Sequence, residues 1–273
     1  MLLAVASWLI GAFLRYETFR PIGLAGKPFS ISVYGGLRSG EQLTFFGTLA
    51  LTAALGCAIA LRPHRIRTAF AGGFCVTAAE VAAYMTAFAT RNSGHLGMGF
   101  YVTLAGAALE AVVAVSALVV VATGSPDARP ASSRTIGLAI VAAVVIGTST
   151  SLRSVSFRGL ALGSFTPLSF RSGAAATIAF AAVATVLVLA VRIRGRVGSA
   201  LLLGLAATEI IIVLDALIQR FGSPGTSPLH PHLTIGWWGR VVAVAMMLVL
   251  AQQLRATRAP QPGVADETAP LPA

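Results

Sequence analysis

Arg15-Tyr-Glu-Thr-Phe-Arg20 recurs as Arg153-Ser-Val-Ser-Phe-Arg158, at an offset of 138. Four more features return in the same order, at offsets between 129 and 139. They are Pro28-x-Ser30 with Pro167-x-Ser169, Arg38-Ser-Gly40 with Arg171-Ser-Gly173, Glu80 and Arg91 with Glu209 and Arg220, and His95–Tyr101 with His232–Trp238. Five ordered matches indicate an internal duplication. A polar residue present in both copies is therefore a better functional candidate than an isolated one.

The composition is that of a membrane protein with several spans. The chain is 56% hydrophobic and 11% charged, with a mean hydropathy of +0.82, whereas a soluble domain carries about 25% charged residues. The formal net charge of +11 comes from arginines that lie between long apolar blocks. That placement favours lipid headgroups and membrane topology as the explanation, and excludes a nucleic-acid partner.

Segments near the length of a membrane helix, about 20 apolar residues, recur along the chain. They are 1–14, 43–61, 67–90, 99–122, 136–151, 174–191, 198–219 and 237–254. The first is short, and the offset of 138 places Met1 opposite Ala139, inside the fifth segment. We therefore expect 1–14 to be a true first helix, slightly truncated or following a misassigned start codon.

The predicted fold is an all-α polytopic membrane protein with eight transmembrane helices, arranged as two tandem, like-oriented four-helix repeats. The repeats are 1–122 and 136–256, joined by a linker at 123–135 and followed by a disordered tail at 257–273. An even number of helices per repeat gives both copies the same orientation. Short basic turns at 62–67 and 192–196 predict that this side and both termini face the cytoplasm, in the cytoplasmic (inner) membrane.

Four acidic residues fall inside apolar segments and are the candidate catalytic groups. Glu80 and Glu209 are duplicated, whereas Glu110 and Asp215 are not. A carboxylate at the centre of a bilayer costs roughly 2.5–3.5 kcal/mol, so it normally faces a cavity or a partner. The functional interpretation is a pair that donates and accepts protons. The alternative is that each glutamate bonds a neighbouring Arg, Ser or Thr and fixes helix packing.

Eight duplicated arginines and two histidines are the candidate substrate-binding residues. The arginines run against the positive-inside tendency, and their forked donors suit a phosphate or carboxylate head, although lipid headgroups would also explain them. The histidines precede interfacial aromatic residues, and the alternative is that they ligate a haem iron. No metal-ligand spacing or cofactor motif is present, so neither is predicted. The residues are Arg15, Arg20, Arg38, Arg91, Arg153, Arg158, Arg171, Arg220, His95 and His232.

The arrangement of four plus four helices with long first loops resembles haem A synthase. The histidine pairs and the acidic, cysteine-bearing first loop of that family are absent, so its chemistry is not carried over. Carboxylates inside helices are also similar to those of membrane-embedded terpene cyclases, but the local likeness at Ala79-Glu80-Val81 is too short to assign a family.

The predicted function is a membrane-embedded enzyme that performs acid–base chemistry on a lipophilic substrate, isoprenoid or lipid-like, with an anionic head. The first alternative is a proton-coupled transporter of a small anion or amphiphile. The second is a haem-binding or non-catalytic subunit of a larger membrane complex. In each case the expected surroundings are the lipid bilayer and a lipophilic or anionic small molecule.

Overall fold

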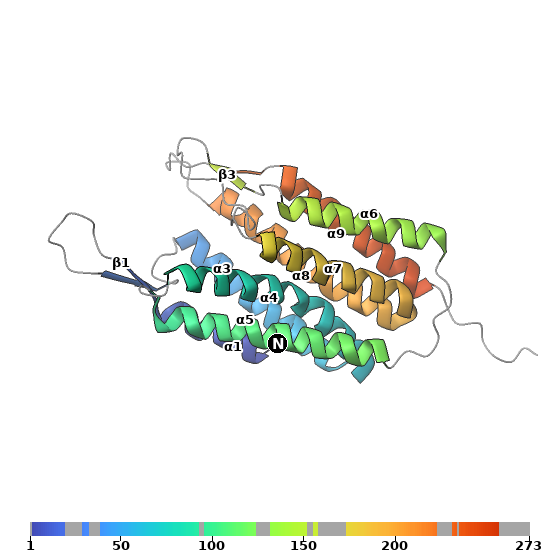
Figure 1. Cartoon of the computed structure of the whole chain (residues 1–273), viewed down its shortest axis with the longest axis horizontal. Coiled ribbons are helices and arrows are strands. Elements are labelled where there is room, and N and C mark those ends of the chain that lie inside the picture. Colours follow the sequence, from blue (N-terminus) through green and yellow to red (C-terminus); the bar gives the residue numbers. More distant parts are fainter. Residues whose placement is uncertain are drawn as a thin grey trace, which may run out of the picture.

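The computed structural model describes residues 2–19, 29–32, 39–92, 96–123, 132–151, 155–157, 173–222, 231–233 and 235–256. Within these ranges it contains eight helices and four short strands. The helices are α1 (Leu2–Phe13), α3 (Ser39–Ala60), α4 (His64–Asn92), α5 (Met98–Thr123), α6 (Ser133–Ser151), α7 (Gly173–Ile193), α8 (Gly195–Gly222) and α9 (Ile235–Ala256). Figure 1 shows them side by side along one common axis.

The eight helices coincide with the eight apolar segments of the sequence, so the prediction of a helical protein is confirmed. Three of them are long and apolar enough to cross a membrane over the described residues, namely Met98–Thr123, Gly195–Leu214 and Ile235–Ala256. Large aliphatic side chains such as Val112, Val115 and Val188 are exposed on the outside of the bundle. These features indicate a membrane location, because lipid tails solvate an apolar exterior that water does not.

Two short antiparallel sheets lie in the connections between helices, and the sequence did not predict them. β1 (Arg15–Phe19) pairs with β2 (Phe29–Ser32), and β3 (Val155–Phe157) pairs with β4 (Pro231–Leu233). Figure 1 shows β1 and β3 at the same end of the bundle. The strands therefore mark one end, and the short turns between α3 and α4 and between α7 and α8 mark the other.

The turn between α7 and α8 leaves a single residue, Arg194, between the two helices. Arg194 and Gly195 adopt left-handed backbone angles, with φ of 57° and 59°, a conformation that costs a side-chain-bearing residue more than glycine. The Arg194 amide donates to the Ala190 carbonyl at 3.0 Å, and the Gly198 amide donates to the Arg194 carbonyl at 3.0 Å. These bonds end one helix and start the next within two residues.

The centre of the molecule is a close crossing of α4 and α8. A Cβ on Gly73 would collide with the Leu201 carbonyl, and a Cβ on Gly204 would collide with the Phe70 carbonyl. The two glycines each lie nine residues after the first residue of their helix, so the crossing is reciprocal. Small residues of this kind let helix backbones approach closely in membranes.

A hydrogen bond between the two helices reinforces this crossing. The Thr208 hydroxyl donates to the Phe74 carbonyl at 2.8 Å. Around it, a buried aliphatic core joins α4 and α8 to α6, α7 and α9, with Val186, Leu205 and Leu250 among its fully buried members. Hydrogen bonds between membrane helices average about 0.6 kcal/mol each, so close packing is the main contribution to this contact.

The remaining helices pack around that centre. α4 contacts α5 and α7, while α8 contacts α9 and α3. α1 packs on α5, and α6 packs on α9 and α7. The predicted linker falls between α5 and α6, mostly at residues 124–131, and the predicted tail at 257–273 also lies outside the described residues.

Candidate functional site

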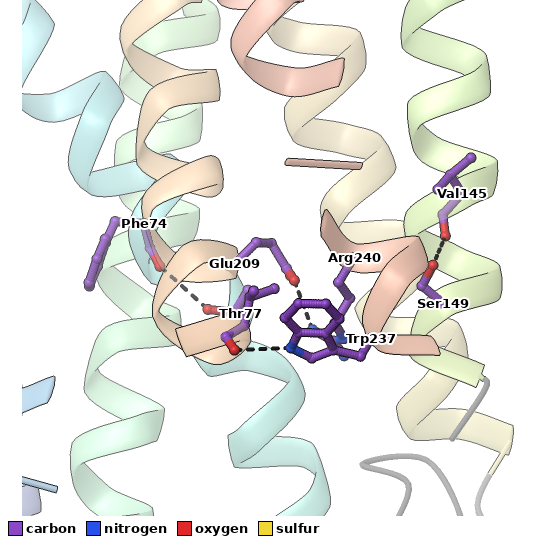
Figure 2. Close-up of polar contacts among 8 residues, drawn as sticks. Phe74, Thr77, Val145, Ser149, Glu209, Trp237 and Arg240 are labelled. Atoms are coloured by element: carbon purple, nitrogen blue, oxygen red, sulfur yellow. Dashed lines mark hydrogen bonds and ion pairs between the residues drawn. The ribbon is translucent and has the colours of Figure 1, made fainter. Parts of the chain in front are cut away.

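An ion pair inside the bundle joins α8 to α9. The Arg240 Nη1 donates to the Glu209 Oε2 at 2.8 Å, and each side chain is 3% exposed. Figure 2 shows the two side chains reaching toward each other from facing helices. Among the described residues, this is the only ion pair. A charge-assisted bond of this length is strong, and its burial shields it from solvent.

A second polar contact holds the same two helices one turn away. The Trp237 indole Nε1 donates to the Val213 carbonyl at 3.1 Å, and Figure 2 shows this indole beside Arg240. Trp237 precedes Arg240 by three residues and Val213 follows Glu209 by four, so each pair lies on one face of its antiparallel helix. The Trp237–Val213 hydrogen bond therefore helps to hold α8 and α9 in the relative position that forms the ion pair.

The other side of α9 is fixed by α6. A Cβ on Gly239 would collide with the Ser149 hydroxyl, so only a residue without a side chain admits α6 at this distance. The Ser149 hydroxyl donates back to the Val145 carbonyl of its own helix. The backbone of α9 next to Arg240 is therefore packed closely against α6.

Arg240 retains hydrogen-bonding capacity that the pair leaves unused. Its Nε is buried and has no hydrogen-bond partner among the described residues. Taking a guanidinium and a carboxylate out of water costs several kcal/mol per ion, and one contact between them repays this only in part. A buried donor without a partner adds roughly 1–3 kcal/mol. The arrangement is therefore a costly way to join two helices.

The pair lies near the middle of α8 and near the start of α9. α8 begins at Gly195, at the end of the bundle that carries the short turns, and Glu209 lies about 21 Å farther along this helix. Arg240 lies about 7.5 Å along α9 from Ile235, at the strand-bearing end.

The positions in α4 and α5 that lie equally far from their helix starts, Ala78 and Thr103, carry no charge. Ala78 lies as far beyond His64 in α4 as Glu209 lies beyond Gly195 in α8. Thr103 likewise lies as far beyond Met98 in α5 as Arg240 lies beyond Ile235 in α9. Both Ala78 and Thr103 are buried, and the Thr103 hydroxyl donates to the Gly99 carbonyl at 2.9 Å. Among the described residues, the α4–α5 contact is thus made without an ion pair.

This register differs from the one that the sequence match suggested. The reciprocal crossing relates α4 to α8 by an offset of 131, whereas Glu80 and Glu209 are 129 apart. Glu80 therefore lies two residues beyond the position that corresponds to Glu209, a rotation of about 200° around its helix. Its backbone belongs to α4, and its side chain lies outside the described part of the structure.

Glu110 is the other acid whose side chain is described. It is partly buried in the middle of α5, whose neighbours are chiefly α4 and α1. It therefore stands apart from the pair between α8 and α9. Asp215 has a described backbone in α8, six residues after Glu209, but its side chain is not described.

Most of the predicted binding residues lie in connections for which side chains are not described. By backbone position, Arg15 is in β1, Arg91 is in the last turn of α4, Arg220 is in the last turn of α8 and His232 is in β4 opposite Ser156. All four belong to the strand-bearing end of the bundle. The remaining predicted residues lie outside the described ranges: Arg20, Arg38, Arg153, Arg158, Arg171 and His95.

Arg240 was not among the residues selected from the sequence. A signal was present, because it is the one charged residue between His232 and Arg255 in an otherwise apolar run. A lone arginine near the start of such a run is also typical of an interfacial anchor. Among the described residues, no group of three or more His, Cys, Asp or Glu side chains is placed to hold a metal ion.

No protein-family model matches the chain, and no curated protein or solved structure matches it either. The chemistry of the Glu209–Arg240 site therefore has to be inferred from its own geometry.

Proposed function

We propose that the chain is an integral membrane protein whose eight helices cross the bilayer as two like-oriented four-helix repeats. The helix contacts support this, because they come in matched pairs across the α4–α8 crossing. The α1–α5 contact matches α6–α9, α4–α5 matches α8–α9, α4–α7 matches α8–α3, and α1–α3 matches α6–α7. Chance packing of eight unrelated helices would not be expected to produce such pairs.

The end with the short turns is the cytoplasmic end in this proposal. It holds the arginine-rich turns at 62–67 and 192–196, as the positive-inside tendency requires. The strand-bearing loops then face the opposite side of the cytoplasmic membrane, and both termini are cytoplasmic. Arg240 lies about 7.5 Å along α9 from the strand-bearing end, and in this proposal a lipid-like molecule from the outer leaflet approaches the pair from that side.

The protein acts on a lipophilic substrate that carries an anionic head. Arg240 binds that head, and the substrate anion takes the place of Glu209 on the guanidinium. The displaced Glu209 carboxylate then accepts a proton from the substrate or, once protonated, returns it. The arginines of the strand-bearing loops hold the head group as it enters. This exchange leaves Arg240 paired throughout, and the proton that Glu209 accepts neutralises the displaced carboxylate.

The observation that carries this proposal is the contrast between the Glu209–Arg240 pair and its uncharged counterpart. Ala78 and Thr103 occupy the matching places between α4 and α5. Packing of the two helices does not therefore require a buried ion pair. Ionisable groups kept inside a membrane at such a cost are candidates for a functional site by default.

The test is conversion of lipid by purified protein in liposomes made from a total membrane lipid extract. Untargeted mass spectrometry before and after incubation should reveal a substrate that falls and a product that rises with wild-type protein. Glu209→Gln keeps the shape and removes the proton-accepting oxygen, so it should abolish the change. Thr185→Val is the matched control, because Thr185 is exposed and donates to the Ala181 carbonyl of its own helix. Equal conversion by Glu209→Gln and wild type would refute the assignment.

A proton-coupled transporter of a small anion or amphiphile is the second candidate. The same exchange at Arg240 favours it, because release of Glu209 by an incoming anion couples anion binding to proton uptake. In that case, liposomes with an imposed pH gradient would accumulate the anion, and the lipid composition would stay constant. Conversion without a gradient distinguishes the enzyme.

A further inference from the structure

Arginine side chains gather at the end of the bundle opposite the strands. Nine arginines have described side chains, and eight of them lie at the helix ends and turns of this side. Most are exposed. The eight are Arg62, Arg65, Arg67, Arg134, Arg192, Arg194, Arg196 and Arg255.

The described part of the chain places no acidic side chain near them. The two described acids are Glu110, in the middle of α5, and Glu209, in the middle of α8. Each lies roughly 20 Å along its helix from the arginine-bearing end, which exceeds the screening length of about 8 Å at physiological salt. The positive charge of this end is therefore uncompensated by those groups.

Exposed aliphatic surface begins directly beside these cations. Leu61 is 89% exposed next to Arg62, and Val188 is 66% exposed one helical turn before Arg192. Ile136 is also exposed, two residues after Arg134. A soluble polyanion would need cations surrounded by polar surface. An apolar surface with a cationic border matches the junction between acyl chains and phosphate heads.

We propose that this end is a binding surface for anionic phospholipid headgroups of the leaflet it faces, with the arginines at the starts of α4 and α8 as its centre. Arg65 and Arg196 are exposed and lie at equivalent places, one residue after the first residue of each helix. Arg67 is partly engaged, because its Nη1 donates to the Ala60 carbonyl at 3.3 Å and so fixes the guanidinium over the end of α3. The inference rests on the proposed transmembrane arrangement, and it is independent of the chemistry at Glu209.

The test compares retention of phosphatidylglycerol with retention of phosphatidylcholine of identical acyl chains, by native mass spectrometry of the full chain. Wild type should retain phosphatidylglycerol preferentially, and Arg65→Gln/Arg196→Gln should weaken that retention roughly 10- to 30-fold. The control is Gln252→Ala/Gln253→Ala, which changes two exposed side chains near the end of α9, on the same side of the bundle, without altering its charge. It should leave retention within about 2-fold of wild type, because the attraction for the headgroups depends on the cations.

Further variants keep the outcome decisive. Arg65→Lys/Arg196→Lys preserves the charge and should restore most of the preference, and raising the salt should remove it. If the double glutamine variant fails to fold, each single glutamine variant is measured in its place. The proposal is overturned if phosphatidylglycerol retention falls equally in Arg65→Gln/Arg196→Gln and in Gln252→Ala/Gln253→Ala, or if wild type retains both lipids alike. A loss of lipid conversion at Glu209 does not alter this measurement.

Discussion

Removing one member of the Glu209–Arg240 pair should destabilise the protein far more than removing both. Each side chain is 3% exposed and the bond is 2.8 Å long. Arg240→Met therefore leaves a carboxylate in the core, and Glu209→Leu leaves a guanidinium whose Nε already has no partner among the described residues. Stranding a buried charge costs about 3–5 kcal/mol.

The double variant Glu209→Leu/Arg240→Met should behave differently from the sum of its parts. Two apolar side chains of similar length fill the same space and leave no bare charge, and such replacements are neutral or stabilising by about 1–4 kcal/mol. The sum of the single effects would be about 6–10 kcal/mol. The expected coupling energy is therefore at least about 6 kcal/mol, against about 0–1 kcal/mol for an exposed pair.

The assay is reversible unfolding of all four proteins in mixed detergent micelles, followed by the far-UV helical signal and by tryptophan fluorescence. The four unfolding free energies close a double-mutant cycle. Single changes that each cost under about 1 kcal/mol, with a double change equal to their sum, would show that the two side chains are solvated and do not form the pair in the membrane protein.

Two further predictions concern the packing that holds the site. Gly204→Ala pushes α8 away from the Phe70 carbonyl and should cost about 2 kcal/mol or more, whereas Gly137→Ala, with open space around it, should be neutral or stabilising in thermal unfolding. Trp237→Phe keeps an aromatic ring and removes the bond to the Val213 carbonyl. It should cost about 0.6–1.7 kcal/mol, measured by the same unfolding assay, and a change below about 0.2 kcal/mol would show that the bond is absent.

Helices and their order were predictable because each one leaves a long apolar block in the sequence. The segment 1–14 was assigned to a helix through the repeat despite its length, and α1 at Leu2–Phe13 confirms it. The strands were not predictable in the same way. Ser156 and His232 pair in β3 and β4 although α7 and α8 separate them along the chain, and such pairing depends on how the helices bring the loops together.

The candidate site was predicted in part. Glu209 was identified because a carboxylate inside an apolar segment needs a partner, and an arginine partner was the alternative interpretation. Which arginine serves was not evident, because that depends on the rotation of α9 about its axis. Matching the two glutamates in the sequence relates α4 to α8 by an offset of 129 residues. The close approach at Gly73 and Gly204 relates the same two helices by an offset of 131 residues.

In the proposed function the buried pair acts on a bound anion and a proton, so its loss should separate activity from stability. The decisive measurement is lipid conversion in liposomes by Glu209→Leu/Arg240→Met, on protein first shown to unfold at or above the wild-type temperature. We expect a folded, stable protein without detectable conversion. Wild-type conversion by that stable double variant would contradict the account, because the two charges would then serve packing alone.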